Sequence, residues 1–176
     1  MSIKEIYQKS IIPKMKEKFG YKNTFRVPKI EKIVVAIGTG TALADQKMLD
    51  EMKETIFKIT GQKPIETKAK KAISGFKLRK GQKVGLKVTM RGKRMNDFFD
   101  KLINITLPRT RDFKGVKAAF DGRGNLTIGF KEQIAFPEIE EGNEKLHGLA
   151  ITICTTAKNN EEAKELLTQF GIRFME

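Results

Sequence analysis

The residues most able to do chemistry in this 176-residue chain are the cations of one segment, residues 63–93. The segment holds eleven lysines and arginines and a single acid, Glu66. So many like charges repel one another, which costs folding free energy unless a polyanion neutralises them. Charge runs that only solvate a surface usually mix both signs, so a solvated surface hairpin is the weaker interpretation. We expect this segment to bind phosphate backbones.

Within this segment, residues 84–90 are expected to form a strand with one cationic face. Apolar residues alternate there with small or polar ones, which are Gly85, Lys87, Thr89 and Arg91. A period of two indicates a strand with one buried face. The glycine would let a neighbouring backbone come close.

Residues 74–83, just before this strand, are expected to form an exposed and mobile basic loop. Gly75 and Gly81 lie near its two ends, and few of its residues are apolar. Phe76 is its one aromatic residue. That side chain could stack on a base, but packing against the body of the protein is the favoured interpretation.

The whole chain carries the same bias, with a formal net charge of +14 and an isoelectric point near 9.9. Values of this size point to nucleic acid or to an anionic membrane surface as the partner. No apolar run approaches the length that spans a bilayer, and the N-terminus has no signal-peptide pattern. We therefore expect a cytoplasmic protein without a membrane partner.

The residues suited to catalysis form no constellation, and we expect no catalytic residue, metal or cofactor. His147 and Cys154 are single residues of their types and have no partner in a motif. Asp45, Asp50 and Glu51 lie beside lysines in a helical pattern, which is typical of surface pairing. A nucleic-acid-processing enzyme is kept as the alternative function. A basic membrane-surface protein, suggested by the lysines of the N-terminal helix, is a more distant one.

Hydrophobic periodicity predicts the elements that must position the basic segment. Helices are expected at residues 3–19, from about 42 to 60, at 93–107 and at 160–170, and strands at 29–37, 64–67, 84–90, 126–130 and 149–154. Pro13 should break or kink the first helix, and Pro108 should close the third. Asn160 should cap the last helix. The glycines at 38 and 40 indicate a tight turn and not a nucleotide-binding loop.

This order of elements predicts an α+β fold. A single antiparallel sheet with helices gathered on one face would satisfy it, and the other face would stay open. We expect one RNA-binding domain over residues 1–176, with the N-terminal helical segment 1–20 packed on it. The residues predicted on the open face include Lys32, Lys87, Thr89, Arg91 and Asn125.

Several runs of the sequence resemble the bacterial large-subunit ribosomal protein five family, and the resemblance covers nearly the whole chain. The longest is IFKITGQKPIETKAKKA at residues 56–72. The others are VPKIEK at 27–32, SGFK at 74–77, LPRTRDF at 107–113, FDGRGN at 120–125 and FPEI at 136–139.

This resemblance implies a curved antiparallel sheet whose helices lie on its convex side. It also implies that 5S rRNA binds the open concave face and nearby loops, in the central protuberance of the large subunit. Family positions at that face correspond to Gln62 and Thr89 here. A third position, usually Asn, is Ala36, which lacks the amide that could donate and accept hydrogen bonds.

The resemblance assigns further partners as well. It implies that the basic loop contacts peptidyl-site tRNA through Ser74, Gly75, Phe76, Lys77, Arg79, Lys80 and Lys83. It also implies contacts with large-subunit rRNA, with other central-protuberance proteins and, as an intersubunit bridge, with small-subunit ribosomal protein thirteen. The residues expected to bind rRNA are Lys32, Gln62, Lys63, Lys68, Lys70, Lys87, Thr89, Arg91 and Asn125.

Overall fold

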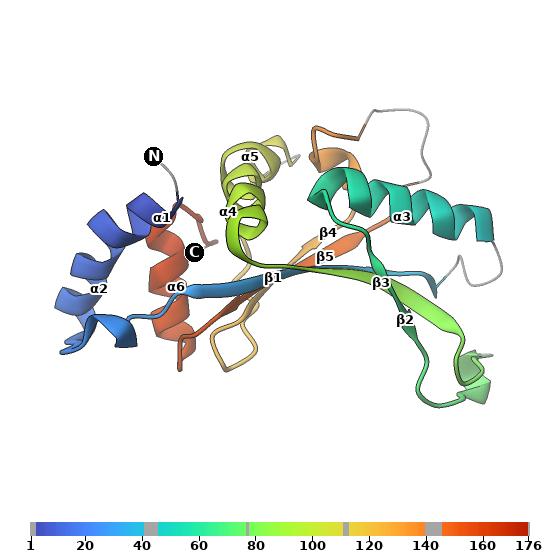
Figure 1. Ribbon diagram of the computed structural model, residues 1–176, viewed down its shortest axis with the longest axis horizontal. Helices are drawn as coiled ribbons and strands as arrows, with labels where there is room; N and C mark the ends of the chain where they lie inside the picture. Colours follow the sequence, from blue (N-terminus) through green and yellow to red (C-terminus); the bar gives the residue numbers. More distant parts are fainter. Residues whose placement is uncertain (1–2, 41–45, 77, 111–112, 140–145, 176) are drawn as a thin grey trace. The chain divides into compact units, whose positions relative to one another are not determined.

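Five strands form one open antiparallel sheet in the order β2-β3-β1-β5-β4 (Figure 1). The structure is a computed structural model that describes residues 3–40, 46–76, 78–110, 113–139 and 146–175. The strands are β1 Ile30–Gly38, β2 Ile65–Lys68, β3 Lys83–Met90, β4 Leu126–Phe130 and β5 Leu149–Thr155. Each lies within one residue of its predicted limits, because alternating burial marks a strand clearly. The predicted α+β class and antiparallel sheet are confirmed.

Six α-helices and two π-helical turns accompany the sheet in the described part of the chain. The helices are α1 Ile3–Ile6, α2 Ile12–Phe19, α3 Gln46–Thr60, α4 Gly92–Lys101, α5 Leu107–Arg109 and α6 Asn160–Gln169. The π turns are Tyr7–Ile11, between α1 and α2, and Leu102–Thr106, between α4 and α5.

The two prolines expected to interrupt helices each lie in the first turn of a helix that follows a π turn, α2 or α5. Pro13 and Pro108 are each the second residue after a π turn. A proline normally clashes with the carbonyl four residues earlier, which is Lys9 or Asn104 here, and both lie within a π turn. The wider turn relieves that conflict, because its hydrogen bonds reach one residue further. The prediction that Pro108 closes the helix was therefore wrong, and the helix continues to Arg109.

The contacts of the chain divide it into two compact units. Unit 1 contains Met1–Ile33, Met90–Ile128 and Thr152–Glu176, and unit 2 contains Val34–Thr89 and Gly129–Ile151. Each unit is therefore assembled from segments that are distant in sequence.

In unit 1, the N-terminal helices pack against α6. Ile11, Met15, Val27 and Leu166 form a buried cluster there. The ring of Phe170 stacks on Tyr7 at 6.3 Å between centroids and meets Phe99 edge-on at 5.3 Å. The Tyr7 hydroxyl lies 3.2 Å from the carbonyl oxygens of Val27 and Pro28, so it can donate to either. This hydroxyl ties the π turn Tyr7–Ile11 to the chain that enters β1.

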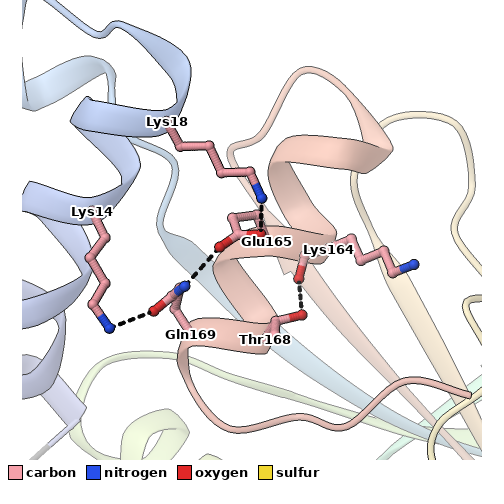
Figure 2. A network of polar contacts seen from close by, with 6 residues as sticks. All are labelled: Lys14, Lys18, Lys164, Glu165, Thr168 and Gln169. Carbon is pink, nitrogen blue, oxygen red and sulfur yellow. Dashed lines mark hydrogen bonds and ion pairs between the residues drawn. The ribbon is translucent and has the colours of Figure 1, made fainter.

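A polar network also links α2 to α6, and Figure 2 shows its residues. Lys18 Nζ donates to Glu165 Oε2 at 2.6 Å, and Gln169 Nε2 donates to Glu165 Oε1 at 2.7 Å. Lys14 Nζ donates to Gln169 Oε1 at 3.2 Å. The bond from Lys18, followed by that from Gln169, lowers the pKa of Glu165. Lys18 is largely exposed, so the pair orients α2 on α6 more than it stabilises the fold.

Asn160 does not cap α6, contrary to the sequence prediction. Asn159 occupies the N-cap position, and its side chain makes no capping hydrogen bond. The Asn160 side chain instead accepts a hydrogen bond from the Gly124 backbone at 3.2 Å. It therefore holds the turn before β4 against the start of α6.

In unit 2, α3 lies over one face of the strands (Figure 1). The buried apolar side chains of α3 are Leu49, Met52, Ile56 and Ile59, and those of the strands beneath include Val35, Ile37, Leu86 and Val88. The alternate residues of β3, which point the other way, are Gly85, Lys87 and Thr89. One strand thus supplies both a core face and an open face.

Gly85 is required where three strands come close together. A Cβ atom built there would lie 2.9 Å from the Ile37 carbonyl oxygen of β1 and 2.9 Å from Thr67 Oγ1 of β2. Real Cβ atoms essentially never show contacts under 3.0 Å. The Ile37 oxygen belongs to a sheet backbone and cannot move aside without disturbing the strand.

We therefore expect Gly85→Ala to lower the free energy of unfolding by about 1–3 kcal/mol, as overpacked sites do. Urea unfolding followed by circular dichroism would measure it. Gly129→Ala in β4 is the matched control, because nothing lies within 4 Å of the position that its methyl group would take. It should change stability by less than about 0.5 kcal/mol. Equal effects of the two substitutions would refute the close approach at Gly85.

Candidate nucleic-acid interface

Four cations of unit 2 that were predicted to bind rRNA are exposed and have no acidic partner among the described residues. Lys63, Lys68, Lys70 and Lys87 are all exposed, and no ion pair involves them within the described residues. Such uncompensated charges raise the local potential and attract anions. These four lysines are therefore exposed positive charges without an ion pair among the described residues, and their binding of phosphates stays a prediction.

The open face next to these lysines is built from β2 and β3. The register pairs Ile65 with Lys87 and Thr67 with Gly85, so these four residues share one side of the sheet. Ile65 and Lys87 are exposed, and Thr89 is half-buried. The face therefore offers a cation and a hydroxyl two residues apart on β3.

The structure brings Gln62 and Thr89 into contact, although they are 27 residues apart in sequence. Gln62 Nε2 donates to the Thr89 carbonyl oxygen at 3.4 Å. Gln62 leaves α3 through Gly61, whose φ of +65° is the left-handed conformation that ends a helix. The Thr89 hydroxyl makes no hydrogen bond to another described residue. That hydroxyl is consequently available to a ligand.

Ala36 lies on β1 in the same unit and is half-buried. By strand alternation it faces away from the buried side chains of Val35 and Ile37. Its methyl group can form no hydrogen bond, so of these three positions only Gln62 and Thr89 carry polar side chains.

The basic loop is the end of a hydrogen-bonded hairpin, residues 69–83, here called the basic hairpin. Ala69 N donates to Gln82 O at 2.8 Å, and Gly81 N donates to Ala69 O at 2.9 Å. Ile73 and Leu78 exchange two backbone bonds, of 3.0 and 3.1 Å, on either side of the 3-10 turn Ser74–Phe76. These bonds join the two arms of the hairpin to each other.

The predicted tRNA-contacting residues occupy the end of the basic hairpin. Ser74, Gly75, Arg79 and Lys80 are exposed. Lys77 and the side chain of Phe76 lie outside the described part of the structure. Gln82, which the sequence did not single out, accepts a bond from Arg79 N at 3.0 Å and shapes the turn. The only sequence signal for this role of Gln82 is that its side chain is polar.

Glu66, the one acid of the basic segment, anchors the base of the hairpin. Its Oε1 atom accepts from Lys53 Nζ of α3 at 2.8 Å and from Lys83 Nζ at 3.0 Å. The bond from Lys53, followed by that from Lys83, lowers the pKa of Glu66. Lys83 therefore differs from Arg79 and Lys80, because its charge already has a partner within the protein.

The other predicted rRNA-binding residues belong to unit 1. Lys32 is half-buried in β1, and Arg91 is exposed at the N-cap position of α4, beyond the end of β3. Asn125 is committed to the turn before β4. Its Nδ2 donates to Asp121 Oδ2 at 2.6 Å, and its Oδ1 accepts from Thr155 N at 3.2 Å. The first of these bonds is the main cause of the lowered pKa of Asp121.

Two further features of the described residues concern metal ions and membranes. They contain no group of three or more His, Cys, Asp or Glu side chains that could hold a metal ion. None of their helices is long and apolar enough to cross a bilayer.

Almost the whole chain matches known protein families. Residues 23–79 match the family described as ribosomal protein L5. Residues 83–174 match the C-terminal region of the same ribosomal family. The two matches meet inside the basic hairpin.

The anchor at Glu66 predicts a pH-dependent stability. Because its pKa is lowered from 4.5, the ionised carboxylate stabilises the fold above that pH. The contribution is lost as the pH falls through the lower pKa of the folded state. We expect wild type to have a higher urea midpoint than Glu66→Gln at pH 7, and the difference should shrink progressively below pH 4.5.

Glu132→Gln is the control for this measurement. Glu132 is exposed in the same unit and has no ion pair among the described residues. The substitution removes the same charge without breaking an anchor, so the midpoint should hardly move at neutral pH. A pH-independent loss in Glu66→Gln would show that its ionisation is not what stabilises the hairpin base.

Proposed function

Because this chain belongs to the ribosomal protein L5 family, whose members are structural components of the large ribosomal subunit, we propose that it binds 5S rRNA and anchors it in the central protuberance. The observation that carries the proposal is the set of uncompensated cations in unit 2. Lys63, Lys68, Lys70 and Lys87 are exposed in the same unit as the contact between Gln62 and Thr89. Phosphate-binding charge and directional polar groups therefore occur in the same unit.

The open face suits the shape of an RNA helix. A-form RNA displays its 2′-hydroxyls and base edges in a wide, shallow minor groove, which favours recognition by a flat surface. On β3, the absence of a side chain at Gly85 lets β1 and β2 come close to the strand, which keeps the sheet compact beside Lys87. Thr89 reaches only a short distance, so its hydroxyl selects a groove or backbone oxygen in close contact. Lysines give affinity and Thr89 gives selectivity.

The basic hairpin serves a second RNA, which we take to be tRNA in the peptidyl site. Its exposed Arg79 and Lys80 are separated from Lys87 by the anchor at Glu66 and Lys83. Contacts with large-subunit rRNA, with other central-protuberance proteins and with small-subunit ribosomal protein thirteen complete the proposed set of partners. The proposed location is the cytoplasmic ribosome. A nucleic-acid-processing activity has no observation in its favour.

The test of 5S rRNA binding separates charge from hydrogen bonding. We expect log K to fall with log salt at a slope of several units, because bound phosphates release counterions. Lys87→Ala should reduce that slope by about one. Thr89→Val should leave the slope unchanged but weaken binding by about 1 kcal/mol or more, because a buried polar partner on the RNA loses its bond. Gel shift or filter binding at several salt concentrations measures both quantities.

Two comparisons make this test decisive. Lys131→Ala removes an exposed lysine of the same unit that is outside the proposed interface, and both slope and affinity should be retained. An unrelated structured RNA of equal length should bind more weakly than 5S rRNA. A slope near zero, or equal binding of the two RNAs, would count against the proposal.

The role of the basic hairpin is tested by shortening it. Replacing residues 76–81 with Gly-Ser removes Arg79 and Lys80 but keeps the anchor between Glu66 and Lys83. We expect nearly unchanged 5S affinity for the free protein and faster dissociation of peptidyl-site tRNA from ribosomes that carry the deletion. The double variant Arg79→Ala/Lys80→Ala, which keeps the hairpin length, should show the same pattern. Loss of 5S binding with normal tRNA retention would reverse the proposed roles.

A further inference from the structure

Phe25 is the most exposed of the large apolar side chains in the described part of the protein. It is 96% exposed, whereas Ile65, Leu146 and Phe57 are 65%, 58% and 52% exposed. Those three side chains still rest partly on the protein, as single surface hydrophobics usually do. Phe25 rests on almost nothing, so its whole ring is available to a partner.

The backbone that carries Phe25 is fixed by hydrogen bonds. It belongs to the 3-10 turn Thr24–Arg26, and Asn23 Oδ1 caps that turn by accepting from Phe25 N at 2.9 Å. Arg26 N donates to Asn23 O at 3.1 Å, and Val27 N donates to Thr24 O at 3.2 Å. Lys16 Nζ of α2 donates to Thr24 Oγ1 at 2.6 Å. The exposed ring therefore stands on an ordered turn.

The chain after the turn is also held to unit 1. Val27 is buried in the cluster beneath α2 and α6. Lys29 pairs with Thr156, since Thr156 N donates to Lys29 O at 2.9 Å and Lys29 N donates to Thr156 Oγ1 at 3.0 Å. An aromatic ring on such a support loses little conformational entropy when it binds, because its backbone is already positioned.

The charges beside Phe25 indicate what this partner is. Lys22, Arg26 and Lys29 are exposed, and none has an ion pair among the described residues. The core of a protein–protein interface is depleted of lysine, whereas an aromatic ring among cations is an arrangement that binds single-stranded nucleic acid. The cations hold phosphates while the ring stacks on a base, and stacking tolerates any base.

We propose that Phe25 is a stacking site for an unpaired base of ribosomal RNA, with Lys22, Arg26 and Lys29 holding the adjoining phosphates. The site belongs to unit 1 and is separate from the residues proposed to bind 5S rRNA in unit 2. The inference rests on the proposed function, since it needs an RNA partner. The unpaired base comes either from 5S rRNA or from large-subunit rRNA.

The absence of tryptophan from the chain allows a direct test. Phe25→Trp in the full-length protein places a single indole at the site, and stacking on a base quenches indole fluorescence. Phe57→Trp on α3 is the matched control, because Phe57 is also an exposed aromatic residue. Each variant is titrated with deproteinised 5S rRNA and, separately, with deproteinised large-subunit rRNA. The RNA that quenches the fluorescence of the F25W protein, and not that of F57W, identifies the source of the base.

Affinity measurements on further variants complete the experiment. For the RNA that quenches, Phe25→Ala and Phe25→Leu should both bind at least about fivefold more weakly than wild type, because both lose stacking. Phe25→Tyr should bind like wild type. The inference is overturned if F25W stays unquenched while wild type binds RNA, and in that case the proposed function survives. The inference is also overturned if Phe25→Leu binds the RNA as tightly as wild type, because leucine is apolar but cannot stack on a base. An apolar contact with a protein would then be the better explanation of the exposed ring. Failure of wild type to bind either RNA removes the proposed function and this site together.

Discussion

Electrostatic self-repulsion is the constraint on which the arrangement of this protein depends. With 35 basic and 21 acidic residues, the chain cannot pair every cation. Several paired cations join different elements, as with Lys18 on Glu165 and Lys53 and Lys83 on Glu66. Many of the cations without an ion pair among the described residues, such as Lys63 and Lys87, are exposed to water, which screens their mutual repulsion. Bound RNA removes that repulsion, so binding and stability are coupled through the same charges.

The strands were predictable from the sequence because one physical signal dominates them. Alternating burial in β1, β3, β4 and β5 follows directly from alternating residue types, and only the limits shifted by one residue. The prediction for Pro108 was wrong because local propensity ignores the option of a π turn. No residue type in Leu102–Thr106 indicates a π turn, and the turn depends instead on the packing around it.

The candidate interface was predictable in its charges but not in its connections. The exposure of Lys63, Lys68 and Lys87 follows from their number and from the lack of acids. The role of Glu66 could not be inferred, since it depends on Lys53 of α3 coming near β2 in the folded chain. The same holds for Asn160, which looked like a helix cap and instead bonds Gly124, 36 residues away. Short polar side chains can satisfy either a local or a distant partner, and only the fold selects between them.

The interleaving of the two units has a consequence for how the protein is made. Unit 2 needs residues up to Ile151, and unit 1 needs residues from Thr152 onward. β5, the last strand to be synthesised, lies between β1 and β4 in the sheet, so β4 has no neighbour within the sheet until β5 emerges. Neither unit can form in full while the chain is being translated. During that time, residues 63–93 lack the folded elements that support them in the finished protein. Such dominance of distant contacts slows folding, and a nascent chain of this kind is exposed to aggregation or to premature capture by RNA until its final strand arrives.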